Sequence, residues 1–315
     1  VFAGIMSNMA SELGYVVLIP LAAMIFHSLG RHPLAGLAAA FCGVSGGYSA
    51  NLLIGTVDPL LSGITQEAAR LLDPAYVVGA EANWFFMFAS TFFVTLIGGL
   101  VTERIVEPKL GKFDSAYADS DIDQHRMEGL TATEKRALKG TGLAALALVA
   151  LVAVMVVPES GILRNPETGL VSGSPFLRGI VVIVAIAFTV LGFVYGRLAG
   201  TFVNLSLGSA SAQWAVTAPI FVPMLMLMGY APEVIQAAYR IGDSVTNLIT
   251  PMMSYFGLIL AVATRYRNDM GIGTLVALML PYTLFMLIGW SLLFFIWVFV
   301  FGLPVGPGSA THYSM

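Results

Sequence analysis

The sequence has little charge. Only 10% of its 315 residues are Asp, Glu, Lys or Arg, against about 25% in ordinary soluble domains, whereas 57% are apolar. Its formal net charge of −3 excludes the basic surface that neutralises the phosphates of a nucleic acid. The composition therefore excludes a soluble enzyme, a disordered chain and a nucleic-acid binder, and it predicts a membrane protein with several spans.

Cysteine and histidine are scarce as well. Cys42 is the single cysteine, which excludes an intramolecular disulfide and a cysteine metal centre. The four histidines never approach the spacing HxxxH, and the sequence contains no HExxH motif. We therefore expect a protein that is not an enzyme and that carries no cofactor.

Apolar stretches long enough to cross a bilayer recur along the chain, since a spanning helix needs about 20 mostly apolar residues. Two long regions, 1–62 and 201–263, are apolar but carry polar residues inside. The polar segment 102–141 holds seven of the 15 basic residues and is predicted to be a cytoplasmic linker. Four stretches are typical of ordinary spans: 82–101, 142–157, 176–196 and 272–303.

The two polar regions align with each other without gaps at an offset of 199 residues. Charge then orients the copies, because Arg31 and His32 follow the first arm of copy one, whereas Arg265 and Arg267 follow the second arm of copy two. By the positive-inside rule the copies run in opposite directions. An inverted repeat with Gly- and Pro-broken helices at matching positions predicts a secondary transporter with its site near the bilayer midplane. The identical pairs are Pro20 and Pro219, Gly30 and Gly229, Pro33 and Pro232, Ala38 and Ala237, Ala39 and Ala238, Gly43 and Gly242, and Ser45 and Ser244.

The expected fold class is an all-α membrane protein, an inverted-repeat secondary transporter with two re-entrant hairpins and broken transmembrane helices. With the linker 102–141 inside, the predicted spans bring the chain back inside before residue 198, whereas the second hairpin must start outside, and the junction 198–201 is too short to cross the membrane. The first hairpin likewise needs an arm ahead of Val1. We therefore expect further segments before residue 1 and near 200/201. The predicted divisions are a first repeat with its hairpin arm, broken helix and following span (1–101), the cytoplasmic linker (102–141), scaffold spans (142–200), a second repeat with hairpin and broken helix (201–271), and a C-terminal span and tail (272–315).

Two pairs of motifs closely resemble the p-aminobenzoyl-glutamate transporter family, AbgT. In the second copy they are GSASAQWAVTAPIFVP (208–223) and APEVIQAAYRIGDSVTNLITPMMSYF (231–256), and in the first copy MSNMASELGYVVLIP (6–20) and VSGGYSANLLIGTVDPLLSGIT (44–65). The resemblance implies a dimeric carrier of the bacterial inner membrane with two re-entrant hairpins and two broken helices in each subunit. It implies transport of p-aminobenzoyl-glutamate and related folate-pathway antimetabolites such as sulfonamides, driven by an ion gradient. Uptake and export are both attributed to the family.

Ionisable residues inside membrane segments cost about 2.5–3.5 kcal/mol each on insertion scales, so each is a functional candidate. Arg240 and Asp243 lie three residues apart and share a helix face. They either neutralise one another or, as the resemblance favours, Arg240 faces a substrate carboxylate and Asp243 binds a coupling cation or proton. Asp58 is either a helix cap or a second coupling carboxylate, and Glu12 either caps a hairpin arm or takes part in coupling.

Small polar residues mark the two expected hairpin tips, where helix N-termini attract carboxylates, although such residues also permit close helix packing. Trp214 either lies at a membrane interface or, within the family motif, stacks on the aminobenzoyl ring. Pro232 is expected to position the broken helix. The candidate substrate-binding residues are Ser7, Asn8, Ser209, Ser211, Trp214, Pro232 and Arg240. The candidate ion- or proton-coupling residues are Asp58, Asp243, Asn204, Asn51 and Asn247, with Na⁺ at Asn204 and Asp243.

The expected partners are a small anionic aromatic substrate, membrane lipid and a second copy of the chain, without nucleic acid. The coupling ion is expected to be H⁺ or Na⁺. Two other functions stay open at this point. A Na⁺-coupled dicarboxylate carrier would share the architecture, and an anion channel would also use helix N-termini to attract anions.

Overall fold

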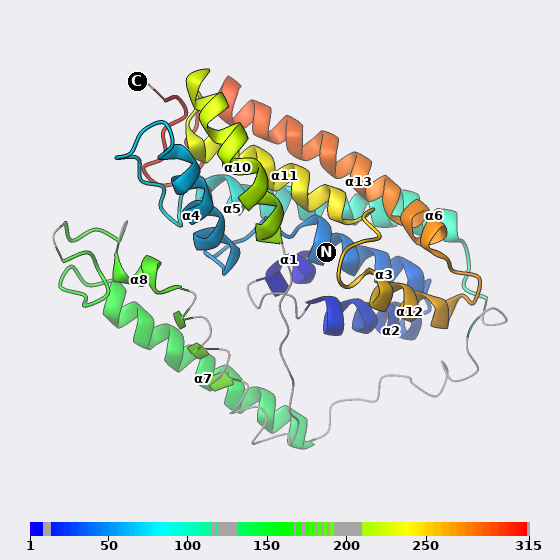
Figure 1. Cartoon of the computed structure of the whole chain (residues 1–315). Helices are drawn as coiled ribbons and strands as arrows, with labels where there is room; N and C mark the ends of the chain where they lie inside the picture. The colour runs from blue at the N-terminus through cyan, green and yellow to red at the C-terminus, as the bar shows by residue number, and fades with distance from the viewer. Residues whose placement is uncertain are drawn as a thin grey trace.

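The computed structural model of the chain describes residues 1–8, 14–114, 118, 132–166, 168–171, 174–180, 182–183, 186–187, 190–191 and 210–313. Within these ranges the regular structure is helical, and strand pairing is limited to one isolated bridge between Tyr230 and His312. Figure 1 shows long helices packed side by side, with α7 lying apart from the helices around α5 and α13. The main helices are α1 (Phe2–Ser7), α2 (Ile19–Ser28), α3 (Pro33–Phe41), α4 (Val57–Ala69), α5 (Trp84–Val101), α6 (Glu107–Leu110), α7 (Ala132–Val156), α8 (Pro175–Arg178), α10 (Ala210–Leu227), α11 (Pro232–Asn247), α12 (Phe256–Tyr266) and α13 (Ile272–Phe295).

Several of these helices continue through π-helical turns, which allow a helix to bend without ending. The π-helical segments are η2 (Gly14–Leu18), η3 (Cys42–Gly46), η4 (Thr102–Val106) and η7 (Ile296–Val300). They precede α2, extend α3, join α5 to α6 and extend α13, in that order.

Three helices within the described residues are long and apolar enough to cross a membrane: Trp84–Leu110, Lys135–Val156 and Ile272–Val300. They coincide with three of the four stretches, 82–101, 142–157 and 272–303, that the sequence predicts to be spans. The fourth prediction, 176–196, is described only in part, with α8 at its start. The polar segment 102–141 is helical at both ends, because η4 and α6 prolong α5 and α7 begins at Ala132.

Each copy contains a turn between two helices, and the two turns have matching backbone geometry. Gly30 and Gly229 both have positive φ, 72° and 89°, a conformation that glycine adopts without strain. Pro33 and Pro232 both follow an extended N-cap and start a helix, α3 and α11. Proline suits the first helical position because its missing N–H would have no partner there. The aligned Gly and Pro pairs of the sequence therefore correspond to equivalent helix–turn–helix connections. We call residues 30–33 the first joint and residues 229–232 the second joint.

Both copies contain the predicted interruption after the joint. In copy one, η3 ends at Gly46 and α4 begins at Val57. In copy two, α11 ends at Asn247 and α12 begins at Phe256. We call the intervening residues, 47–56 and 248–255, the first and second break.

The two joints lie at opposite ends of the span Trp84–Leu110. Arg31 of the first joint forms an ion pair with Glu107 in α6. At the other end, Asn83, the N-cap of α5, donates to the backbone carbonyl of Glu233 in the first turn of α11, at 2.7 Å. This span has 27 residues and is about 40 Å long at 1.5 Å per residue. The copies therefore run in opposite directions, as the charge pattern predicts.

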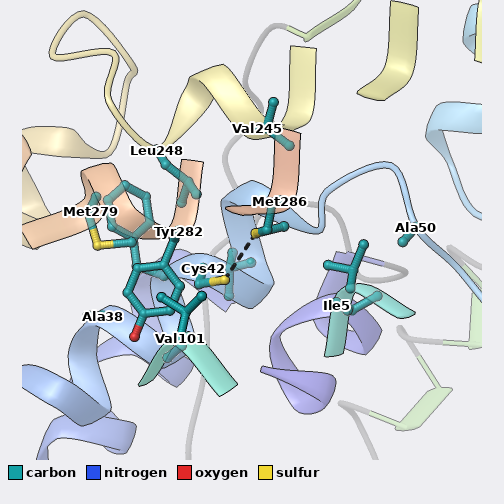
Figure 2. Packing of buried hydrophobic residues seen from close by; sticks show 14 of the residues in the cluster. Ile5, Ala38, Cys42, Ala50, Val101, Val245, Leu248, Met279, Tyr282 and Met286 are labelled. Carbon is teal, nitrogen blue, oxygen red and sulfur yellow. Dashed lines mark hydrogen bonds between the residues drawn. The ribbon is translucent and has the colours of Figure 1, made fainter. Parts of the chain in front are cut away.

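A continuous apolar core joins α1, η3 and α13. Figure 2 shows Cys42 facing Met286 inside this core, with the thiol 3.3 Å from the thioether sulfur. Polar contacts also link α5 to α13, because the Trp290 indole donates to the Ser90 hydroxyl at 2.8 Å. This core fixes α3 and η3, and with them the position of the first break.

Candidate functional site

A buried ion pair joins the two copies. Nη1 of Arg240, in α11, lies 2.6 Å from Oδ1 of Asp58, in the first turn of α4. Only 1% and 6% of the two side chains are exposed. Asp58 follows the first break, and Arg240 lies in the helix that follows the second joint. The broken helices of the repeat therefore bring the two charges together.

Asp58 is surrounded by donors. Its second carboxylate oxygen accepts from the Asn51 amide at 2.6 Å and from the backbone N–H of Gly55 at 2.7 Å. Asp58 is not the N-cap of α4, which is Thr56; it lies in the first turn of that helix, binds the backbone N–H of Gly55 and pairs with Arg240. The Oδ1 atom of Asn51 is buried and has no hydrogen-bond partner among the described residues.

Arg240 also binds the first break directly. Its Nη2 donates to the carbonyl of Ser49 at 2.8 Å, while the N–H of Ser49 donates to the Ser244 hydroxyl at 3.1 Å. Two neighbouring turns of α11 therefore hold the backbone N–H and C=O of one residue, Ser49, in the other copy. The third guanidinium donor, Nε, is buried and lacks a partner within the described part of the chain.

The alternative in which Arg240 and Asp243 neutralise one another is wrong, because the salt bridge described for Arg240 is with Asp58. Asp243 is 8% exposed and accepts a hydrogen bond from the Tyr239 hydroxyl at 3.4 Å. The Asp58 carboxylate in the other copy therefore takes the partner that the sequence spacing suggested for Asp243. The reason is that the first break brings Asp58 within reach of the guanidinium.

Trp214 is buried rather than placed at an exposed interface, with 1% of its surface accessible. Its indole N–H donates to the Thr65 hydroxyl of α4 at 2.9 Å. Its ring stacks on Tyr239 of α11, with centroids 4.2 Å apart and an interplanar angle of 26°. Trp214 therefore ties α10 to both α4 and α11.

Ser7 and Asn8, the residues expected at the first hairpin tip, differ from the expectation. Ser7 is the last residue of α1 and Asn8 is its C-cap, so neither residue lies at a helix N-terminus. The Ser7 hydroxyl donates within its own helix, to the Gly4 carbonyl at 2.7 Å. Asn8 is buried and its amide donates to the Gly47 carbonyl in the first break at 3.4 Å, which makes it part of the same neighbourhood as Ser49.

The remaining predicted residues lie in or next to the same helices, or outside the described residues. Pro232 is buried at the start of α11, and Asn247 is the half-buried last residue of that helix. Ser211 lies in the first turn of α10. Ser209, Asn204 and Glu12 lie outside the described residues, so the predicted pairing of Asn204 with Asp243 stays a prediction.

Four residues of the site escaped the sequence reasoning: Ser49, Ser244, Tyr239 and Thr65. Ser244 carried a signal, since it is identical to its repeat partner Ser45. Tyr239 carried a weaker one, since it precedes Asp243 by four residues and so shares its helix face. Ser49 and Thr65 had none, because their partners are 195 and 149 residues away in the chain.

Residues 43–47 match a sequence motif that is typical of serine hydrolases. Residues 43–47 read GVSGG and fit the pattern GxSxG, which marks a nucleophile only on a strand–turn–helix elbow. Ser45 instead lies in the π-helix η3, where its hydroxyl contacts the Met253 sulfur at 3.6 Å. No group of three His, Cys, Asp or Glu side chains that could hold a metal ion occurs among the described residues.

Comparison with known proteins agrees with this architecture. The profile of the AbgT putative transporter family matches residues 1–204 and 198–313. The p-aminobenzoyl-glutamate transport protein of Escherichia coli K12 is 34% identical over 378 aligned positions, covering 98% of this chain and 73% of that protein.

Two solved structures are similar. The YdaH transporter of Alcanivorax borkumensis, described as having an unusual topology, superposes with a TM-score of 0.84 at 41% identity, over 97% of this chain and 78% of its own. Neisseria gonorrhoeae MtrF, described as illuminating a class of antimetabolite efflux pumps, gives 0.80 at 54% identity, over 98% and 75%. These relatives are transporters rather than enzymes. With its apolar helices and inverted copies, this chain is a multi-pass membrane protein that belongs to the AbgT transporter family.

Proposed function

We propose that this chain is an ion-gradient-coupled secondary transporter of p-aminobenzoyl-glutamate and related folate-pathway antimetabolites, sulfonamides included, in the bacterial inner membrane. The observation that carries the proposal is the buried ion pair between Arg240 and Asp58, which joins the two inverted copies. Relatives named for p-aminobenzoyl-glutamate transport and for antimetabolite efflux support the substrate class. The working unit is proposed to be a homodimer in lipid, with no nucleic acid involved.

Arg240 is the proposed contact for the substrate carboxylate. Two of its guanidinium nitrogens are used by Asp58 and Ser49, whereas Nε has no partner among the described groups. A buried donor without a partner is costly, and an anionic substrate would supply the missing acceptor. Arginine suits this role because its fork of donors binds carboxylates in two-point geometry.

Asp58, Asn51 and Asp243 are the proposed coupling groups. The unpartnered Oδ1 of Asn51 lies on the same side chain whose amide binds Asp58. Amide and carboxylate oxygens, with carbonyls freed at a helix break, are the ligands that transporters offer to Na⁺. A buried carboxylate whose partner changes during transport is equally suited to exchange a proton.

The test is flux of p-aminobenzoyl-glutamate in proteoliposomes that contain the full-length protein. We expect flux to collapse in Asp243→Asn, which keeps the side-chain shape, and in Arg240→Lys, which keeps one charge but loses the forked geometry. Arg267→Gln is the matched control, because Arg267 forms an exposed pair with Asp269 and should leave flux unchanged. Wild-type flux in both site variants would overturn the proposal.

Separately imposed pH and Na⁺ gradients identify the coupling ion and the direction. Flux that follows neither gradient would indicate an anion channel. Succinate that competes with p-aminobenzoyl-glutamate and is itself transported would indicate a dicarboxylate carrier. Coupled transport of the aromatic substrate without succinate competition is the expected result.

A further inference from the structure

Tyr239 makes two contacts at once: its ring stacks on Trp214, and its hydroxyl binds Asp243. Tyr239 presents its ring to Trp214 at 4.2 Å, while its hydroxyl donates to Asp243 at 3.4 Å. One side chain therefore contacts both the indole of α10 and the carboxylate of α11.

The geometry constrains how Trp214 could meet a substrate. The indole is 1% exposed, with Thr65 on its N–H edge and Tyr239 on its face. A substrate ring can stack on the face of the indole that Tyr239 covers only after that stack opens. Opening the stack also disturbs the hydrogen bond that Tyr239 donates to Asp243.

We propose that Tyr239 is a positioning residue that links the position of Trp214 to the charge of Asp243. When Asp243 is a free carboxylate it accepts the phenol hydrogen bond, and Tyr239 is held against Trp214. When a proton or Na⁺ occupies the carboxylate, that bond weakens and Tyr239 releases the indole. The substrate-related part of this inference rests on the proposed function, whereas the link between Tyr239, Trp214 and Asp243 does not.

The surroundings of Asp243 leave Tyr239 well placed for this role. The other charged group nearby on α11 is Arg240, which is turned toward Asp58 on α4. Neither α10 nor α13, which also pack on α11, carries a charged side chain. The titratable Tyr282 of α13 is hydrogen-bonded to Thr102, the first residue of η4.

Coupling between two sites is reciprocal, so an ion that loosens Tyr239 must raise the affinity for any ligand that needs Trp214 free. Typical couplings change affinity by about 5- to 150-fold. The long oxygen–oxygen distance of 3.4 Å places this one at the low end.

The first experiment needs no substrate. The fluorescence of Trp214 is obtained as the difference between the full-length protein and its Trp214→Phe variant, and it is followed during Na⁺ and pH titrations. We expect an ion-dependent change that is lost in Tyr239→Phe, which keeps the ring but removes the hydroxyl, and in Asp243→Asn. Tyr282→Phe is the control, since it removes a phenol hydroxyl that is hydrogen-bonded elsewhere, to Thr102, and it should keep the change. A response that persists in Tyr239→Phe, or no response in the unmodified protein, overturns the inference.

The second experiment measures the Kd of p-aminobenzoyl-glutamate at low and high concentration of the ion that gave the response. In the unmodified protein we expect the Kd at high ion concentration to be about fivefold lower than the Kd at low ion concentration. In Tyr239→Phe we expect the Kd not to depend on the ion. An unchanged ratio in Tyr239→Phe contradicts the inference. If the ligand does not bind at all while the fluorescence result holds, the proposed substrate is wrong and the role of Tyr239 stands.

Discussion

Arg240 and Asp58 are 182 residues apart in the chain, yet their side chains lie 2.6 Å apart with almost no exposure to solvent. Removing one partner of such a pair leaves an uncompensated buried charge, which costs about 3–5 kcal/mol. We therefore expect Arg240→Met to lower the thermal unfolding temperature in detergent markedly. The double variant with Asp58→Leu should recover part of that loss, because no charge is left unpaired.

The control for this prediction is Arg267→Gln. Its ion pair with Asp269 is exposed, and such pairs contribute about 0–1 kcal/mol. Equal unfolding temperatures for Arg240→Met and Arg267→Gln would show that the buried pair does not stabilise the fold.

Helices α2 and α3 pack closely through Gly36. A methyl group at this position would overlap the backbone carbonyl oxygen of Ala22, and backbone cannot move aside as a side chain can. We expect Gly36→Ala to destabilise the protein by about 1–3 kcal/mol, the usual cost of overpacking. Gly99→Ala is the matched control in α5, where nothing lies within 4 Å of the added carbon. Thermal unfolding should separate the two, and a neutral Gly36→Ala would contradict the close approach.

The contact between Ser90 and Trp290 is predicted to stabilise the pairing of α5 with α13. The indole donates at 2.8 Å and the serine hydroxyl donates onward to the Phe86 carbonyl at 2.7 Å. Interhelical hydrogen bonds in membranes contribute about 0.6 kcal/mol on average. A double-mutant cycle of Ser90→Ala and Trp290→Phe should give a coupling energy of this size and sign. Strict additivity of the two variants would show that the bond adds nothing.

His32 makes the first joint sensitive to acid. It is the N-cap of α3, where its Nδ1 accepts from the backbone N–H of Leu34 at 3.2 Å. Burial, and then the nearby charge of Arg267, lower the pKa of His32 below its usual value. A protonated Nδ1 cannot accept, so the stabilisation is complete above about pH 6.5, the unfolded-state pKa, and is lost as the pH falls through the lowered pKa of the folded state.

The unfolding temperature measured between pH 7.5 and pH 5 checks this prediction. His32→Asn keeps a side-chain acceptor that does not titrate, and N-caps contribute about 1 kcal/mol. The variant should therefore lose less stability on acidification than the unmodified protein. Parallel curves for the two proteins would assign the acid sensitivity to other groups.

The sequence by itself determined the membrane class, the two copies and their breaks. These features are local: a run of apolar residues makes a span, glycine at positive φ makes the turn at Gly30 and Gly229, and proline starts the helices at Pro33 and Pro232. Such requirements act within a few residues, so the pattern of residue types reports them directly. The opposite orientation of the copies followed in the same way from where the basic residues fall.

Only the tertiary structure decided which charges meet. Spacing on one helix favoured Asp243 as a partner of Arg240, but the first break brings Asp58 to the guanidinium and leaves Asp243 with Tyr239. The burial of Trp214 between α4 and α11 was equally out of reach of a sequence pattern, because its partner Thr65 is 149 residues away. Contacts of this kind depend on how distant helices pack against one another, and packing is set by the whole fold rather than by the residues on either side.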